Sequence, residues 1–379
     1  MSCISEQLKQ LALQSLRLSN PNPRVGCVIT TPDGREIGTG HTQRAGGPHA
    51  EVMALRDAQA RGESVVGATV YVTLEPCSHH GRTPPCCDAL IAAGVGKVVI
   101  AAGDPNPLVA GQGAERLRAA GVAVEWLPAD HEAARASREL NIGFFSRMVR
   151  RTPWVRMKMA SSMDGVTALD NGTSQWITGE AARADGHAWR ARACAVLTGI
   201  GTVLEDDPML DVRLADTPRQ PHLVVIDSRL QTPTTARLFN TPANGLPRQL
   251  WIYHAVRDAE REAALQTLGA TLIPMPSGHG KVDLPAMLGD LARREVNELH
   301  VEAGHKLNGS LLREGLVDEI LLYLAPQLLG KGAGLTDFGP LQNLQDGVQL
   351  AYESVDKVGN DLRILARRQG RDGFLGDMT

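Results

Sequence analysis

The stretch from Pro48 to Cys87 constrains the fold more than any other part of the sequence. It contains one imidazole (His49), a carboxylate two residues later (Glu51) and two thiols (Cys77 and Cys86). Three such ligands can hold Zn²⁺ and leave a fourth position for water, while a carboxylate that does not bind the metal moves protons. The residues therefore predict a zinc-dependent deaminase site.

The residues around the two thiols predict elements that would bring them together. Residues 65–74 are rich in β-branched side chains, so Cys77 is expected just beyond the end of a strand. The pair Pro84-Pro85 precedes an apolar run that ends at Gly94, and this pattern predicts a helix. Cys86 would then lie in the first helical turn, where the helix dipole and free N–H groups favour a thiolate.

Two features leave an alternative open. Residues two apart do not share a helix face, so His49 and Glu51 can converge only near a helix end. Cys86 follows the first thiol by nine positions, so the usual P-C-x-x-C spacing of base deaminases is absent. A purely structural zinc site would need a fourth protein ligand, which His79, His80 or Cys87 could supply.

The segment from Leu74 to Cys87 closely resembles the deaminase half of the bifunctional riboflavin-biosynthesis deaminase/reductase family of bacteria, and the likeness covers essentially the whole chain. The resemblance implies zinc ligands at His49, Cys77 and Cys86 and a proton shuttle at Glu51. It implies substrate contacts for Asn22, His41, Arg82, Asp104 and Asn106. Position alone leaves Asn22 evenly divided between a turn residue and a base contact.

Length and composition bound the remaining possibilities. A chain of 379 residues is expected to hold two domains, each with its own core. No apolar run approaches the roughly 20 residues of a membrane span, and no secretory signal is visible at the N-terminus. Six cysteines in a chain of this length point to reduced thiols. We therefore expect a cytoplasmic protein without a membrane partner.

Charge argues against a nucleic-acid partner. Through Arg150 the chain has 15 basic and 14 acidic residues, and beyond it 24 basic and 28 acidic ones. A protein that grips a phosphate backbone normally carries more positive charge. This count opposes one alternative, a nucleic-acid base deaminase with an appended domain. A second alternative is a zinc-stabilised binding module without chemistry.

Charged residues, a proline and a new strand coincide after an expected helix over residues 131–148, so we place the domain boundary there, giving domains 1–148 and 149–379. An amphipathic helix is expected near residues 6–18, and a strand over 25–30. The second half alternates strand and helix, which predicts a sheet covered by helices. Its expected strands are 154–159, 193–198, 223–227, 250–253, 299–302 and a last one after Gly359, and its expected helices are 180–191, 257–268 and 284–294.

The second half contains no general sequence motif for nucleotide binding. Neither a G-x-G-x-x-G sequence nor a P-loop occurs. The run 301–310 reads as a strand that ends at glycine and continues into a helix at Ser310, where backbone N–H groups could receive a phosphate. Most such turns bind nothing, so this observation is weak by itself.

The second half also resembles the reductase half of the same family, through Lys158-x₅-Asp164-Gly165, 174–178, 202–208 and 301–304. The resemblance implies a cytidine-deaminase-like αβα sandwich followed by a dihydrofolate-reductase-like α/β domain. It implies NADPH contacts for Ala160, Trp176, Thr202, Asp206, Ser228 and a loop of Gly304, His305, Lys306, Leu307 and Asn308. It implies substrate contacts for Lys158, Ser174, Arg190, Leu210, Arg213 and Glu302.

Several of these residues have simpler interpretations. Trp176 and Leu210 could belong to the core. Arg190 could be a solvated charge, although with Arg213 it would make a phosphate clamp. A lysine on an apolar strand (Lys158) and a glutamate at a strand end (Glu302) are harder to explain as packing, and we expect them to place or donate a proton.

The sequence thus predicts a bifunctional enzyme with Zn²⁺ and NADPH as cofactors and a phosphorylated pyrimidine as substrate. Its first domain would deaminate 2,5-diamino-6-(5-phosphoribosylamino)pyrimidin-4-one. Its second would reduce the phosphoribosyl group to a phosphoribityl chain. The resemblance also implies a homo-oligomer, a dimer or a tetramer.

Overall fold

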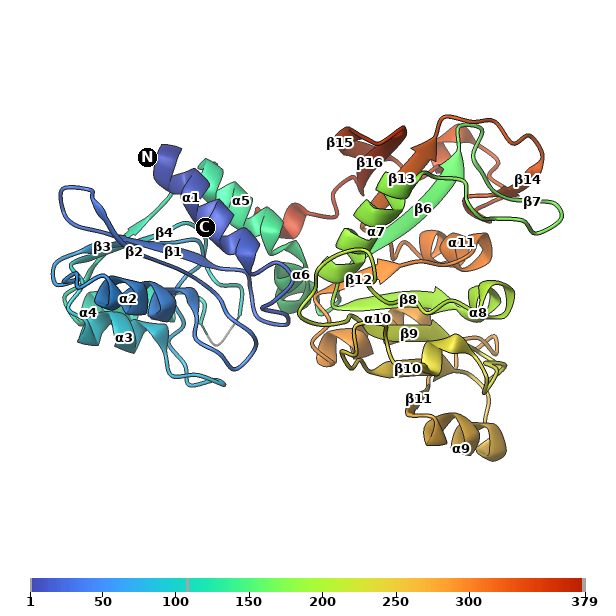
Figure 1. The fold of residues 1–379 in the computed structure, drawn as a ribbon, viewed down its shortest axis with the longest axis horizontal. Helices are drawn as coiled ribbons and strands as arrows, with labels where there is room; N and C mark the ends of the chain where they lie inside the picture. The colour runs from blue at the N-terminus through green and yellow to red at the C-terminus, as the bar shows by residue number, and fades with distance from the viewer. Residues whose placement is uncertain (1, 107–108, 377–379) are drawn as a thin grey trace. The chain divides into compact units, whose positions relative to one another are not determined.

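The computed structural model describes residues 2–106 and 109–376, and the chain divides into two compact units. Of the described residues, those through Arg151 and residues 372–376 form the first unit, and those from Thr152 to Arg371 form the second (Figure 1). The predicted boundary after residue 148 did not anticipate that the C-terminal residues rejoin the first unit.

The first unit is an α/β sandwich around a five-stranded sheet of order β2-β1-β3-β4-β5. β1 runs antiparallel to β2 and β3, whereas β3, β4 and β5 are parallel. In Figure 1, α1 and α5 lie on one face of the sheet, and α2, α3 and α4 lie on the other. The strands are β1 Gly26–Thr30, β2 Glu36–His41, β3 Thr69–Val72, β4 Lys97–Ile100 and β5 Ala123–Trp126. The helices are α1 Ser2–Gln14, α2 Ala50–Ala60, α3 Cys86–Ala92, α4 Gln112–Ala119, α5 Glu132–Leu140 and α6 Ile142–Arg150.

Helix α1 packs directly on β1 because the strand begins with Gly26. A Cβ atom at this position would lie 2.4 Å from the carbonyl oxygen of Leu8 and 2.9 Å from the amide nitrogen of Ala12. The missing side chain therefore lets the helix backbone approach the sheet.

The single helix predicted over residues 131–148 is wrong, because Asn141 divides it into α5 and α6. Asn141 is 1% exposed, and its side-chain oxygen accepts a hydrogen bond from the amide of Arg24 at 2.7 Å. Its side-chain nitrogen donates to the carbonyl of Arg24 at 3.0 Å. This pairing with a distant backbone competes with a continuous helix.

The second unit contains a nine-stranded sheet of order β11-β10-β9-β8-β12-β6-β13-β16-β15. The strands from β11 to β13 are parallel, and β16 and β15 are antiparallel additions at one edge. Its strands are β6 Trp154–Ser162, β8 Ala195–Gly199, β9 His222–Ile226, β10 Leu250–His254, β11 Ala270–Pro274, β12 Glu298–Val301, β13 Glu319–Ala325, β15 Leu350–Val358 and β16 Asp361–Arg368. Its helices are α7 Glu180–Arg192, α8 Ile200–Asp206, α9 Ala259–Thr267, α10 Leu284–Arg293 and α11 His305–Arg313, and a small separate sheet pairs β7 Val166–Leu169 with β14 Gly332–Gly334.

The predicted start of α11 at Ser310 is wrong, because the helix begins at His305 with Gly304 as its N-cap. The loop predicted from Gly304 to Asn308 is therefore the cap and first turn of a helix. Asn308 and Gly309 are poor helix formers, so the sequence did not predict a helical turn here. Tertiary packing overrides their propensity, since both residues are buried in the folded chain.

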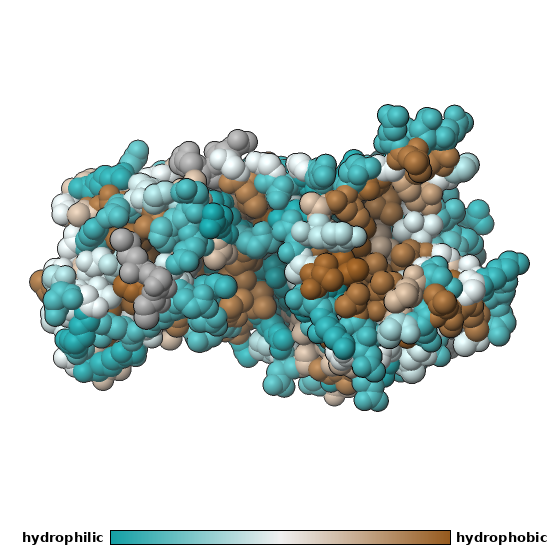
Figure 2. Space-filling model, turned by 90° about the horizontal axis from the view of Figure 1, so that it is seen from above, coloured by the Kyte–Doolittle hydropathy of each residue, from teal (hydrophilic) through white to brown (hydrophobic). Residues whose placement is uncertain are grey.

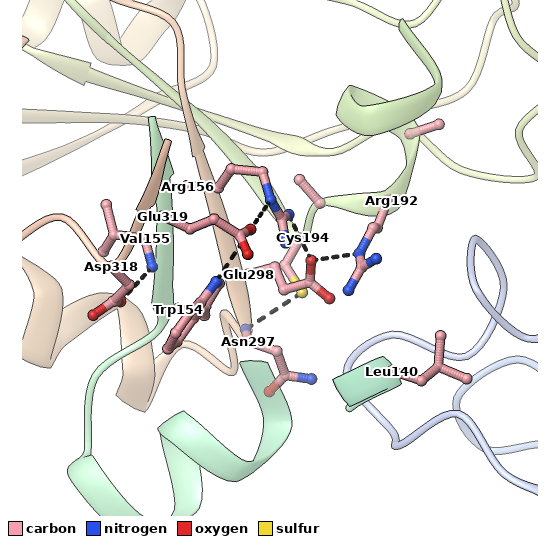
Figure 3. Close-up of polar contacts among 12 residues, drawn as sticks. Leu140, Trp154, Val155, Arg156, Arg192, Cys194, Asn297, Glu298, Asp318 and Glu319 are labelled. Atoms are coloured by element: carbon pink, nitrogen blue, oxygen red, sulfur yellow. Dashed lines mark hydrogen bonds and ion pairs between the residues drawn. The ribbon is translucent and has the colours of Figure 1, made fainter. Parts of the chain in front are cut away.

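A buried ion-pair network ties the central strands together (Figure 3). Arg156 on β6 donates to Glu298 on β12 at 2.9 Å and to Glu319 on β13 at 2.5 Å. Arg192 of α7 also donates to Glu298, at 2.7 Å, and Arg367 of β16 donates to Glu319 at 3.2 Å. Removing one member of such a network leaves an uncompensated buried charge, so the network specifies which strands are neighbours.

Across the described residues, 2–106 and 109–376, we find no helix with the length and apolar character that a bilayer crossing requires.

Candidate active sites

The first unit brings the predicted metal ligands together. His49 is the N-cap of α2, Cys77 lies in the loop after β3, and Cys86 opens α3. The Nδ1 atom of His49 lies 3.6 Å from the Sγ of Cys77 and 3.3 Å from the Sγ of Cys86. With Zn–N bonds of about 2.0 Å and Zn–S bonds of about 2.3 Å, neighbouring ligand atoms in a tetrahedral zinc site are about 3.5 Å apart. The three side chains therefore fit zinc, with Nδ1 as the imidazole ligand.

The two thiols differ in their electrostatic surroundings. Hydrogen bonds from the Cys86 thiol and from His49 hold the pKa of the Cys77 thiol well below its usual range, and the amide N–H of Cys86 also donates to Cys77 Sγ at 3.3 Å. The same contacts, with burial, raise the pKa of Cys86. The amide N–H at the start of α3 thus points to the Sγ of Cys77. The thiolate expected at Cys86 stays a prediction.

Glu51 lies beside the ligands without joining them. It is in the first turn of α2 and 3% exposed. Burial, together with the negative charge of Cys77, raises the pKa of Glu51 to about 7. A carboxyl group with a pKa near the working pH can both accept and donate a proton.

Within the described residues, the clustered ligands are His49, Cys77 and Cys86, with no fourth protein ligand beside them. The Cys87 thiol donates instead to the carbonyl oxygens of Pro76 and Gly113, at 3.3 and 3.5 Å. A three-ligand set leaves a coordination position for water, as catalytic zinc sites do.

The predicted substrate contacts of this unit occupy loops and a strand end. Asn22 lies in the segment after α1, His41 closes β2, and Arg82 lies between Cys77 and α3. Asp104 and Asn106 follow β4, and the amide of Asn106 donates to the Asp104 carboxylate at 2.8 Å. Burial, with negative charge from Glu75 and Cys77, raises the pKa of Asp104 to about 7, which places this carboxyl near the metal ligands. The other contacts stay predictions.

The sequence argument missed Glu75, which precedes the Pro76-Cys77 pair. Glu75 is 3% exposed, and its carboxylate accepts hydrogen bonds from the amides of Asp104 (3.4 Å), Gly111 (2.9 Å) and Ala114 (3.1 Å). It thus fastens the chain after β4 and the start of α4 to the loop that carries Cys77. A glutamate directly after an apolar strand was the available signal, because such a residue is rarely buried without partners.

The second unit gathers a different set of charged groups at the ends of its central strands. The Arg190 guanidinium donates to both carboxylate oxygens of Glu302, at 2.7 and 2.9 Å, and to the carbonyl of Asp211 at 2.5 Å. Burial would raise the pKa of Glu302, but the charge of Arg190 holds this pKa well below its usual range. Burial lowers the pKa of Lys158, partly against the attraction of Glu302. Arg190 is therefore neither a solvated charge nor free to grip a phosphate with its whole fork.

Arg213 and His300 lie beside this cluster of charged groups. Arg213 pairs with the Asp211 carboxylate while its side chain stays 44% exposed, so part of its guanidinium faces solvent. His300 is fully buried, its Nε2 lies 3.6 Å from a Glu302 oxygen, and burial lowers its pKa to about 3. The sequence argument missed Asp211 and His300. A histidine two residues before a strand-end glutamate shares its face of the sheet, which was a usable signal.

The residues expected at the cofactor lie at the ends of neighbouring strands. Ala160 is near the end of β6, Gly304 follows β12, Thr202 follows β8 and Ser228 follows β9. Asp206 ends α8. Most of these residues have small side chains, and Gly304 caps the start of α11, where backbone N–H groups suit a phosphate of NADPH.

Four more of the predicted residues can be placed in the structure. Trp176 is 67% exposed, so the interpretation of this residue as core is wrong. Leu210 is 7% exposed and packs in a hydrophobic cluster, as its core interpretation expected. Asn308 is buried, and its side chain donates to the carbonyls of Ala303 and Leu335 at 3.1 and 3.4 Å. Ser174 is half-buried between β7 and α7.

Comparisons with known proteins identify a family for each half of the chain. Residues 3–102 match the family model "Cytidine and deoxycytidylate deaminase zinc-binding region", and residues 153–364 match "RibD C-terminal domain". The riboflavin biosynthesis protein RibD of Escherichia coli is 44% identical, with 93% of this chain and 95% of the relative aligned. RibD of Aquifex aeolicus is 38% identical over 94% and 96% of the two chains.

Solved structures give the same result. RibD of Acinetobacter baumannii superposes with a TM-score of 0.84 at 39% identity, covering 96% of this chain and 98% of the other. The diaminohydroxyphosphoribosylaminopyrimidine deaminase/5-amino-6-(5-phosphoribosylamino)uracil reductase of Thermotoga maritima superposes with a TM-score of 0.80 at 30% identity, covering 96% and 97%. Together with the two sites, these likenesses confirm the predicted fold class. The chain belongs to the RibD family of bifunctional riboflavin-biosynthesis enzymes, with a zinc-binding deaminase domain followed by an NADPH-using reductase domain.

Proposed function

We propose that the first unit removes an amino group from 2,5-diamino-6-(5-phosphoribosylamino)pyrimidin-4-one. The observation that carries this proposal is the convergence of His49 Nδ1, Cys77 Sγ and Cys86 Sγ, all within 4.8 Å of one another, beside a buried Glu51. Zinc, when bound by these ligands, activates a water at neutral pH. Glu51 takes a proton from the attacking water as its oxygen bonds to the ring carbon that carries the amino group. Glu51 then gives this proton to the amino group, which leaves as ammonia as the C–N bond breaks.

In the second unit, the proposed reaction is reduction of the phosphoribosyl group to a phosphoribityl chain. NADPH supplies the hydride when it is bound. Glu302, which Arg190 holds as a carboxylate, places the sugar, and Lys158 donates the proton that completes the reduction. Arg190 holds Glu302 through its two hydrogen bonds, and Arg213 meets the substrate phosphate with the exposed part of its guanidinium.

This assignment divides the two activities near the predicted boundary, with deamination in residues 1–148 and reduction in residues 149–379. The buried pair of Arg190 and Glu302 and the zinc cluster each lie within one compact unit, which supports the division.

The test is one assay on the whole chain. The purified zinc-loaded protein is incubated with the diaminopyrimidine phosphate, first without and then with NADPH. Ammonia release without NADPH, and NADPH oxidation only after deamination, are expected. No ammonia release from this substrate would overturn the deaminase assignment, and no NADPH oxidation with the deaminated product would overturn the reductase assignment.

The proposal extends to a homo-oligomer, a dimer or tetramer, that works in the cytosol. The edge strand β15 supports self-association, since its Tyr352 and Val355 side chains are 75% and 54% exposed. Figure 2 shows hydrophobic patches among hydrophilic side chains on the face that it presents. Light scattering should give a multiple of the 40.6 kDa chain mass, and Tyr352→Glu should lower it. A wild-type chain that stays monomeric at high concentration would contradict this part.

A further inference from the structure

His300 lies on the same face of the sheet as Glu302 and directly behind it along β12. Side chains two apart on a strand point to the same side, so Glu298, His300 and Glu302 follow one another on this face. In the parallel register with β6, His300 lies opposite Arg156. His300 therefore stands between the buried ion pair of Arg156 with Glu298 and the charged site at Glu302.

The ring of His300 has hydrogen-bonding capacity that the fold does not use. The residue is fully buried, and within the described residues neither ring nitrogen has a hydrogen-bond partner. Burial lowers its pKa to about 3 against the attraction of Glu302, so the imidazole is neutral and carries one N–H. An unpaired buried polar group costs free energy, and proteins retain such costs mainly at functional sites.

The Glu302 carboxylate lies just beyond hydrogen-bond distance of this ring. Its nearer oxygen, Oε1, is 3.6 Å from His300 Nε2, about 0.6 Å farther than in a typical N–H···O bond. A carboxylate accepts and does not donate, so its charge favours the tautomer with the proton on Nε2. A side-chain shift of this size would close the contact.

The other neighbours of Glu302 show what such a contact would do. Arg190 of α7 donates to both carboxylate oxygens, at 2.7 and 2.9 Å. When the strand registers are continued by one residue, Lys158 of β6 and Thr198 of β8 flank Glu302 on its two sides. Each carboxylate oxygen can accept about two hydrogen bonds, so Arg190 leaves one position open on each. A donor from His300 would fill the position on Oε1 and leave the one on Oε2 for the sugar.

We propose that His300 is a positioning residue for the reduction: its Nε2–H bonds to Oε1 of Glu302 when the sugar enters, and so directs Oε2 toward the substrate. The inference rests on the proposed reductase function. No proton passes through His300 in this role, and the imidazole stays neutral throughout. The residue acts on the reaction only through the geometry of Glu302.

The test follows reduction of the deaminated substrate by the full zinc-loaded chain with NADPH. His300→Leu removes both ring nitrogens at similar volume. Its kcat should fall about tenfold, the scale of a hydrogen bond to a charged group, while KM for the substrate and for NADPH stays within twofold. Its urea midpoint should equal or exceed that of the wild type, because an apolar side chain replaces an unpaired polar ring. His300→Gln keeps an N–H donor at a similar reach and should recover most of the lost kcat.

His222→Leu is the matched control, because it removes a half-buried histidine from β9 of the same sheet. It should leave kcat for reduction unchanged, and all three variants should deaminate normally.

The outcomes separate the inference from the function on which it rests. If His300→Leu reduces the substrate at the wild-type rate, His300 has no part in the reaction. If the Leu and Gln variants lose kcat equally, or if the loss follows a lower urea midpoint, the role of His300 is structural and the inference is wrong. If the wild-type chain does not oxidise NADPH with the deaminated substrate, the reductase proposal falls and this inference falls with it.

Discussion

The zinc site and the charged site of the second unit are built in opposite ways. All the metal ligands and the proton shuttle come from one stretch, residues 49–86, carried by the starts of two helices and one loop. The site around Glu302 instead takes Lys158 from β6, Arg190 from α7 and Asp211 from the segment after α8. A site drawn from one stretch can be found by spacing, whereas a dispersed site depends on which strands become neighbours.

Removing a ligand should give the largest effect and should separate the two sites completely. Cys77→Ala takes away one of the three clustered metal ligands, so zinc and deaminase activity should both be lost. Reduction of separately supplied deaminated substrate should be unchanged. Zinc content by mass spectrometry and the two activities measure this, and chelation of the wild type should reproduce it. Cys87→Ser should keep zinc, and loss of zinc there would revive the four-ligand structural site.

Glu51→Gln tests whether deamination can be abolished in the zinc site without loss of the metal. The amide cannot carry the proton, so kcat for deamination should fall by about 10²–10⁴-fold. Zinc content and thermal midpoint should stay near wild type because Glu51 is not a ligand. Persistent ammonia release would show that another group moves the proton.

Glu302→Gln tests the charged site of the second unit, where the residues proposed for catalysis also stabilise the fold. The side chains of Arg190 and Glu302 are 11% and 13% exposed, so the change leaves a buried guanidinium without its counter-charge. Such losses cost about 3–5 kcal/mol. We expect lower stability of the second unit by urea unfolding, together with loss of reductase activity and normal deamination. Glu180→Gln, at an exposed position on α7, is the matched control.

Glu75→Gln tests whether the zinc site also depends on residues outside the stretch 49–86. Three backbone N–H groups share the two oxygens of Glu75, and an amide can accept on one side only. We expect the KM for deamination to rise about tenfold, on the scale of one or two lost hydrogen bonds, with kcat and zinc content little changed. Glu115→Gln, on the exposed side of α4, should do nothing. A fall in kcat at constant KM would contradict a positioning role.

The smallest expected effect lies away from both sites, at His222 on β9. Burial lowers the pKa of His222 from about 6.5 to about 4. A histidine that is harder to protonate in the folded state contributes stability above pH 6.5, and this contribution is lost as the pH falls toward 4. His222→Gln should therefore flatten the decline in stability over that window. Urea midpoints followed by tryptophan fluorescence measure it, and Trp251, whose ring centre lies 4.9 Å from that of the imidazole, contributes to this signal. An unchanged slope would contradict the assignment.

The contrast between the two sites also explains what the sequence could predict. The spacing of His49, Glu51, Cys77 and Cys86 located the metal cluster because helix starts and strand ends are local features. The resemblance named Lys158, Arg190 and Glu302, but their pairing follows from parallel neighbours such as β6 and β12, and strand order has no local signal. The division of the helix at Asn141 depends on Arg24, more than a hundred positions earlier, and so could not be seen.

Two further differences between the predicted and observed secondary structure, at β15 and at the first turn of α11, have another cause. β15 was not predicted because its residues are largely exposed, so the alternation that marks a half-buried strand is absent. The first turn of α11 was read as a loop because Asn308 and Gly309 have weak helix propensity. In both places tertiary contacts decide the conformation, and the local sequence is nearly neutral.

The return of the chain to the first unit after Asp372 has a practical consequence for dissecting the protein. Phe374 and Leu375 pack against the hydrophobic core of that unit, and the Arg150 guanidinium lies 4.8 Å from the centre of the Phe374 ring. A fragment that stops at Arg151 would therefore lack part of its own interior and expose the apolar surface that Phe374 covers. An excised deaminase should be designed with residues 372–376 grafted after Arg151 through a short linker.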